Sequence, residues 1–110
     1  MKYGNRKVVT ADGTFDSVKE YSRWQELKLM QRAGVIYDLQ RQVAFTVIPV
    51  QKDESGKVIE RDVKYIADFT YRNRIDHRLV VEDTKGMKTR EYIIKRKLLL
   101  YRLGIRIKEV

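Results

Sequence analysis

Two apolar runs decide the fold of this chain: Tyr65-Ile66-Ala67-Asp68-Phe69 and Leu79-Val80-Val81-Glu82-Asp83-Thr84-Lys85-Gly86. Each run begins with apolar residues and reaches an acid, and we expect each to form a strand. Residues i and i+2 share one face of a strand, so we expect Asp83 and Lys85 to point the same way and Glu82 to point the opposite way, paired with an arginine. If the two strands are neighbours in a sheet, Asp68 lies beside Asp83.

The rest of the chain reads as a helix, three strands, a second helix and a final strand. The first helix begins with the capping-box pattern Ser17-Val18-Lys19-Glu20 and ends before Gly34. A hairpin turn at Asp53-Glu54-Ser55-Gly56-Lys57 separates the first two strands. The expected elements are helix 17–33, strands 42–49, 58–71 and 77–85, helix 89–103 and strand 105–107.

This order predicts an α/β fold in which a mixed sheet is flanked by helices. Short turns make the first three strands antiparallel, whereas the strand–helix–strand crossover makes the final strand parallel to its neighbour. The 110 residues suffice for one domain, 1–110. Residues 1–12, which include Lys2, Arg6 and Lys7, are expected to form a basic, weakly ordered arm.

The charge of the chain indicates a polyanionic partner. Lys and Arg number 24 against 15 Asp and Glu, a formal net charge of +9. Such an excess favours nucleic acid, because phosphate neutralisation releases condensed counterions. The alternative is a basic solvated surface, as in ribosomal or membrane-surface proteins.

Residue usage narrows the chemistry. The chain has no cysteine and one histidine, His77, which excludes disulfides, thiol nucleophiles and imidazole-rich zinc sites. Any metal would be held by oxygen ligands, which favours Mg²⁺ or Mn²⁺. No signal peptide and no membrane-spanning run is recognisable, so we expect a cytoplasmic protein with no membrane partner.

The acids have structural as well as functional interpretations. Asp68 could be a solvated strand end, and the triplet from Asp83 to Lys85 is common in charged proteins. Glu20 fits a capping box, but it could also be delivered by the first helix to the two aspartates. Expected nucleic-acid contacts are the basic residues near these strands and on the second helix, namely Arg72, Arg74, Arg78, Lys88 and Lys95.

These motifs and their order resemble the PD-(D/E)xK phosphodiesterases, the restriction-endonuclease-like superfamily with an αβββαβ core. More narrowly, the chain is similar to small phage proteins of the Holliday-junction-resolvase or TnsA-endonuclease type. The resemblance covers roughly residues 14–107 and rests on Glu20, Asp68 and the run from Glu82 to Gly86. Ala67 stands where the family name has proline.

The resemblance implies an Mg²⁺- or Mn²⁺-dependent DNA endonuclease in the cytoplasm of a bacterial host. Asp68 and Asp83 would bind the metal with Glu20 as a third ligand, and Lys85 would orient or deprotonate the attacking water. A resolvase would act on branched DNA as a homodimer, with a phage or host replication or recombination protein as a further partner. Two alternatives remain: a non-catalytic nucleic-acid-binding accessory protein of phage replication or packaging, and a module that binds an acidic partner.

Overall fold

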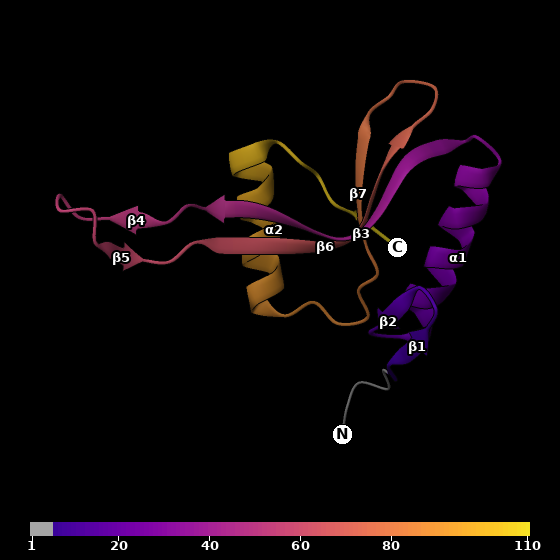
Figure 1. Cartoon of the computed structure of the whole chain (residues 1–110), viewed down its shortest axis with the longest axis horizontal. Helices are drawn as coiled ribbons and strands as arrows, with labels where there is room; N and C mark the ends of the chain where they lie inside the picture. The colour runs from indigo at the N-terminus through magenta and orange to yellow at the C-terminus, as the bar shows by residue number, and fades with distance from the viewer. Residues whose placement is uncertain (1–5) are drawn as a thin grey trace.

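The fold is mixed α/β, with one four-stranded sheet and two helices in residues 6–110, the part that a computed structural model of the chain describes (Figure 1). The sheet order is β3-β6-β7-β8, formed by Ile36–Ile48, Val63–Asn73, Leu79–Asp83 and Lys108–Glu109. β3, β6 and β7 are antiparallel in succession, and β8 runs parallel to β7. The predicted strand directions are therefore confirmed. No helix among the described residues is long and apolar enough to cross a membrane.

Both helices form where their capping residues predict them. α1 spans Val18–Arg32, and the Ser17 hydroxyl accepts a hydrogen bond from the Glu20 amide at 3.1 Å. α2 spans Arg90–Leu103, with Thr89 as its N-cap and Gly104 as its left-handed C-cap at φ 68°. Each cap satisfies backbone groups that the first or last helical turn leaves free.

The start of the chain differs from the expected weakly ordered arm. β1 (Val8–Thr10) pairs with β2 (Gly13–Phe15), so the expectation is wrong for residues 8–12. The hairpin is held because Phe15 is fully buried and because Asp12 accepts hydrogen bonds from Trp24 Nε1 at 2.9 Å and Lys28 Nζ at 2.6 Å. Residues 1–5 of the expected arm lie outside the described residues.

Two strand boundaries also differ from the expectation. β3 begins at Ile36 rather than at residue 42. Its first residues, Ile36 and Tyr37, also pair with β6, and a register shift containing Asp38 (φ 58°) separates them from the rest of the strand. The last strand lies at Lys108–Glu109 rather than at 105–107. Ile107 is instead a core residue, 9% exposed, which packs with Val81 and Leu99.

The β3/β6 ribbon divides the core into two hydrophobic clusters. The cluster beside α1 contains Phe15, Leu27, Ile36, Phe69 and Tyr71, and the cluster beside α2 contains Val47, Tyr65, Ala67, Val81, Tyr92, Leu99 and Ile107. Strand β6 contributes residues to both clusters: Ala67 belongs to the cluster beside α2, and Phe69 belongs to the cluster beside α1. Asp68 occupies this position, opposite Gln42, whose φ of 52° interrupts the extended backbone of β3. Asp68 therefore lies at the boundary between the two hydrophobic clusters.

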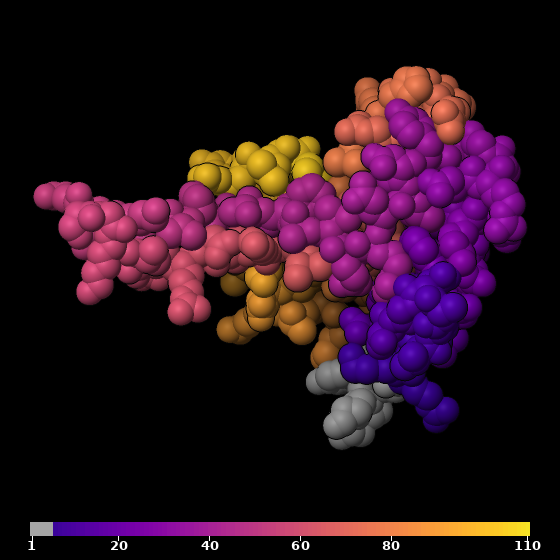
Figure 2. All heavy atoms as spheres, in the orientation of Figure 1, coloured from indigo at the N-terminus to yellow at the C-terminus, as the bar shows by residue number. Residues whose placement is uncertain are grey.

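The far end of the ribbon is a projecting hairpin. β4 (Gln51–Lys52) pairs with β5 (Val58–Glu60), and the Asp53 amide donates to the Lys57 carbonyl at 2.9 Å, as the turn signal predicts. Residues 51–60 are all exposed. Figures 1 and 2 show this hairpin extending away from both helices along the longest axis of the molecule.

Candidate functional site

Pairing of β6 with β7 places the two aspartates side by side. The Asp68 amide donates to Asp83 Oδ1 at 3.2 Å, directly beyond the pair Phe69 and Glu82. Asp68 Oδ2 in turn accepts from the Thr84 amide at 2.8 Å and from the Thr84 hydroxyl at 2.9 Å. Asp68 is thus not a solvated strand end, since it is 8% exposed and joined to the neighbouring strand.

The alternation along β7 separates the neighbouring acids as predicted. Lys85 Nζ lies 3.7 Å from Asp83 Oδ1 and 4.7 Å from the centroid of the Tyr92 ring. Glu82 belongs to the α1 side, where Arg23 Nε and Nη2 donate to its two oxygens at 2.8 and 2.6 Å. Asp83, rather than Glu82, is therefore the partner of Lys85.

Glu20 is held at the start of α1, and its carboxylate turns towards the sheet. Its amide is held by the N-cap, whereas its carboxylate is buried beneath α1 and 2% of the residue is exposed. Gln42 Nε2 donates to Glu20 Oε2 at 3.4 Å, and Arg41 Nη2 lies 3.8 Å from the same oxygen. The helix thus carries this carboxylate to the bend of the ribbon rather than to solvent.

Glu20, Asp68 and Lys85 line one cleft of about 260 Å³. Ser17 and Thr89, the N-caps of α1 and α2, line it as well, so the positive ends of two helices border the same space. Asp83 is fully buried beneath the cleft and does not line it. A cleft lined by acids and by the positive ends of two helices suits a phosphate held beside a cation.

Burial raises the pKa of two of the acids. The pKa of Glu20 rises to about 7 because burial disfavours its charge and because Asp68 and Asp16 repel it. The pKa of Asp83 rises to about 6 because of burial, which the nearby Lys85 ammonium partly offsets. Asp83 Oδ2 is also buried with no hydrogen-bond partner in the described part of the chain. Both carboxylates would gain from an added positive charge.

The donor chemistry of the cleft fits a hard divalent cation. All candidate ligands are carboxylate oxygens, which suit Mg²⁺ or Mn²⁺, and Asp83 Oδ2 is left without a hydrogen-bond partner. Asp68 and Asp83 would hold such an ion, with Glu20 contributing from α1. Within residues 6–110, however, no three His, Cys, Asp or Glu side chains are grouped closely enough to hold a metal ion. The three acids approach one another without forming a closed ligand set.

A basic hollow of about 240 Å³ adjoins the acidic cleft. It shares Lys85 and Thr89 with the cleft and adds Lys64 from β6 and Lys95 from α2. Lys95 Nζ also lies 2.9 Å from Glu91. Sequence reasoning missed Lys64, although its even spacing from Asp68 on one strand was a usable signal.

The predicted arginine patch does not join the cleft. Arg72 lies near the end of β6, and Arg74 and Arg78 lie in the β6–β7 turn that follows. Figure 1 shows this turn between the two strands. At about 3.3 Å per residue, Arg72 is about 13 Å along β6 from Asp68. Arg72 Nη1 donates to the His77 carbonyl at 3.0 Å. None of the three arginines lines the acidic cleft or the basic hollow beside it.

Lys88 also lies outside both hollows. Its Nζ is 3.0 Å from Glu109 Oε1, an ion pair between the loop before α2 and strand β8. Of the five basic residues expected to contact nucleic acid, Lys95 alone lines a hollow beside the acids.

The fold and cleft define a small mixed α/β protein in which buried acids and a lysine lie where the end of β7 pairs with the middle of β6. The chain belongs to the family described as protein of unknown function DUF1064, which it matches over residues 1–108. No curated protein and no solved structure matches the chain.

Proposed function

We propose that this protein is a metal-dependent endonuclease with a restriction-endonuclease-like core that hydrolyses phosphodiester bonds in DNA. The observation that carries the proposal is the position of Asp68, Asp83 and Lys85. They meet where the middle of β6 pairs with the end of β7, and Asp68 and Lys85 line the cleft that Glu20 and two helix N-termini also border. A strongly basic chain supplies the attraction for DNA.

The side chains would divide the work of hydrolysis. Asp68 and Asp83, with Glu20, would hold the ion, which when bound activates water and neutralises charge on the phosphate. Lys85 would place its ammonium beside the scissile phosphate and orient the attacking water. The N-termini of α1 and α2 would favour the phosphate through their partial positive charge.

The basic hollow gives the DNA strand a path. Lys64, Lys85 and Lys95 border a space that continues from the acidic cleft, so successive phosphates could follow them. A domain of this size has little room for a sequence-reading module, which favours recognition of DNA shape. A four-way junction has two-fold pseudo-symmetry and would be cleaved by a homodimer.

The test is cleavage by two single variants. In Mg²⁺ or Mn²⁺, Asp83→Asn and Lys85→Ala should each lower the rate by about 10²-fold or more, because each removes a group acting at the phosphate. Linear, flapped and four-way DNA substrates would be compared by gel under single-turnover conditions. Lys57→Ala at the hairpin tip is the matched control and should cleave as the parent does. Undiminished cleavage by both site variants would refute the assignment.

A non-catalytic nucleic-acid-binding protein is the second candidate. It is favoured by the lack of a closed ligand set for a metal among residues 6–110. Tight binding to all three DNA substrates with no cleavage in either metal would establish this alternative.

A further inference from the structure

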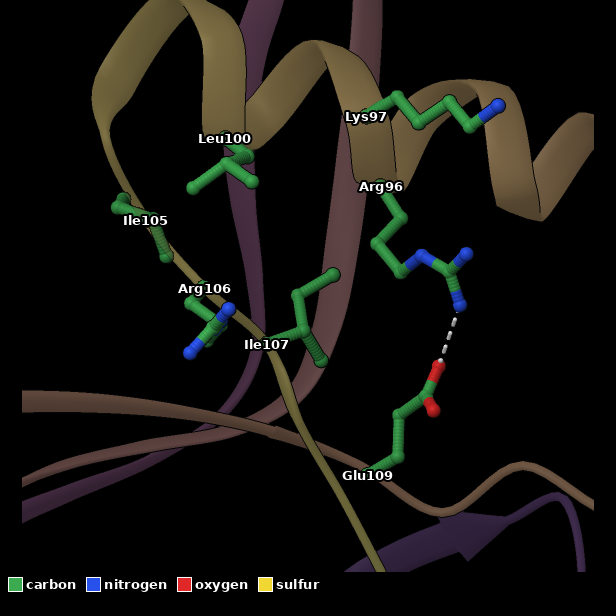
Figure 3. A pocket seen from close by; sticks show the side chains of 7 residues that line it. All are labelled: Arg96, Lys97, Leu100, Ile105, Arg106, Ile107 and Glu109. Atoms are coloured by element: carbon green, nitrogen blue, oxygen red, sulfur yellow. Dashed lines mark hydrogen bonds and ion pairs between the residues drawn. The ribbon is translucent and has the colours of Figure 1, made fainter.

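A separate hollow of about 340 Å³ lies at the C-terminal half of α2 (Figure 3). Its apolar surface comes from Leu100 on the helix and from Ile105 and Ile107 in the segment that follows. Its basic lining residues are Arg96, Lys97 and Arg106, of which Lys97 extends along the helix away from Leu100 in Figure 3. It shares no lining residue with the acidic cleft, so it is a distinct surface.

The edge of this hollow keeps a net positive charge. Its one acid, Glu109, is already engaged by Arg96 at 3.1 Å, Lys88 at 3.0 Å and the Tyr92 hydroxyl at 2.5 Å. Arg106 and Lys97 are in no ion pair within residues 6–110, and both are exposed. Two cations are therefore available to an incoming anionic group.

We propose that this hollow docks an acidic peptide segment of a partner protein that carries one bulky apolar side chain. Leu100 is 50% exposed in the free protein, and covering it together with Ile105 would remove aliphatic surface from water. Carboxylates flanking the apolar side chain would pair with Arg106 and Lys97. An apolar anchor within a charged border is the arrangement that concentrates binding energy in peptide recognition.

The lining argues for a peptide rather than for nucleic acid. No aromatic side chain lines the hollow, so it offers unpaired bases no platform for stacking. Its three aliphatic side chains would contribute nothing to a phosphate backbone. A peptide with acidic residues and one apolar side chain would contact both the aliphatic and the basic lining residues. This proposal does not depend on the nuclease assignment.

The experiment measures binding of a defined probe to the whole chain by fluorescence anisotropy. The probe is a short fluorescein-labelled peptide of aspartates and glycines that ends in phenylalanine. Arg106→Glu and Leu100→Ser should each raise its Kd by about tenfold or more, and so should replacing the probe's phenylalanine by alanine. Arg102→Glu changes an exposed arginine of the same helix that does not line the hollow, and it should leave Kd unchanged.

Three results would overturn the proposal. The first is absence of saturable probe binding, and the second is an equal loss of affinity in Arg102→Glu and Arg106→Glu. The third is that the peptide does not bind, whereas a labelled single-stranded oligonucleotide binds the parent and loses affinity for Arg106→Glu but not for Arg102→Glu. Circular dichroism spectra that match the parent would show that each variant is folded.

Discussion

Glu20 is the residue at which burial and charge conflict most directly. Its carboxylate is almost completely covered, yet Arg41 approaches it only to 3.8 Å and Asp68 repels it. Its pKa of about 7 lies above the ordinary value of 4.5, so folding favours its protonated form. This group therefore stabilises the fold below about pH 4.5, and that contribution is lost as the pH rises through about 7.

Replacing Glu20 by glutamine should remove this pH dependence. With EDTA present to exclude metal, we expect Glu20→Gln to be more stable than the parent at pH 8, by about 1–3 kcal/mol. The difference should shrink towards zero at pH 4.5, where the parent carboxyl is protonated. Urea unfolding followed by circular dichroism across this pH range gives the free energy of unfolding. An equal effect at both pH values would contradict the explanation.

The sequence predicted the partners of the strand acids but not the direction of Glu20. Strand alternation alone placed Asp83 beside Lys85 and Glu82 on the opposite face, because side chains two residues apart share a face. A capping box leaves the carboxylate of Glu20 free to turn either way. The packing of α1 against the bend at Gln42, which depends on contacts distant in sequence, decides that it turns inward.

At the scale of elements, one buried ion pair fastens α1 to the sheet. Glu82 is fully buried, and its carboxylate accepts from both Arg23 and the Tyr71 hydroxyl. The hydrogen bonds of Glu82 raise the pKa of the Arg23 guanidinium, which stays charged at any ordinary pH. A buried carboxylate without a cation would lower the stability of the fold. The charged form of Glu82 on β7 therefore depends on the position of α1, which brings Arg23 to it.

Removing the arginine should therefore destabilise the protein strongly. We expect Arg23→Met to lower the free energy of unfolding by about 3–5 kcal/mol at pH 7, because the buried Glu82 loses both guanidinium hydrogen bonds and keeps as a cation only the ammonium of Lys108, whose Nζ lies 3.9 Å away. Glu26→Ala breaks the other ion pair of Arg23, at 3.2 Å, but that acid is exposed and its loss should cost at most about 1 kcal/mol. Chemical denaturation measures both. Similar losses in the two variants would show that the buried pair has no special role.

Helix boundaries were more predictable than strand boundaries for a local reason. Ser17, Thr89 and Gly104 act within one helical turn of themselves, so the sequence carries their signal directly. Asp38 and Gln42 adopt positive φ inside β3, a conformation that is uncommon for any residue other than glycine and that a β-strand pattern does not predict. Likewise, the alternation at 105–107 resembles a strand, but the burial of Ile107 against α2 depends on the tertiary fold.

At the scale of the whole molecule, the net charge of +9 is larger than the number of basic side chains that line any one of the hollows described above. Lys64, Lys85 and Lys95 border the space beside the acids, whereas Arg72, Arg74 and Arg78 gather at the far turn of the β6–β7 hairpin. The basic surface is therefore divided into areas that substitutions can separate.

Salt dependence should identify the area that contacts DNA. If phosphates follow the basic hollow, Lys64→Ala and Lys95→Ala should each reduce the slope of log K against log salt by about 1. Anisotropy titrations of a labelled duplex at several salt concentrations, with EDTA present to prevent cleavage, measure this slope. Lys57→Ala should leave it unchanged. A fall in slope with Lys57→Ala but not with the other two variants would place the contact at the hairpin tip instead.

The projecting hairpin also makes the molecule convenient for spectroscopy. The chain has no cysteine, and residues 51–60 are exposed at the end of the longest axis, 52 Å in extent. A single Glu54→Cys substitution would therefore create one reactive thiol at a position whose side chain supports no core contact. A maleimide fluorophore or a nitroxide attached there would label the hairpin tip and leave the acidic cleft, the basic hollow and the hollow beside α2 chemically unchanged.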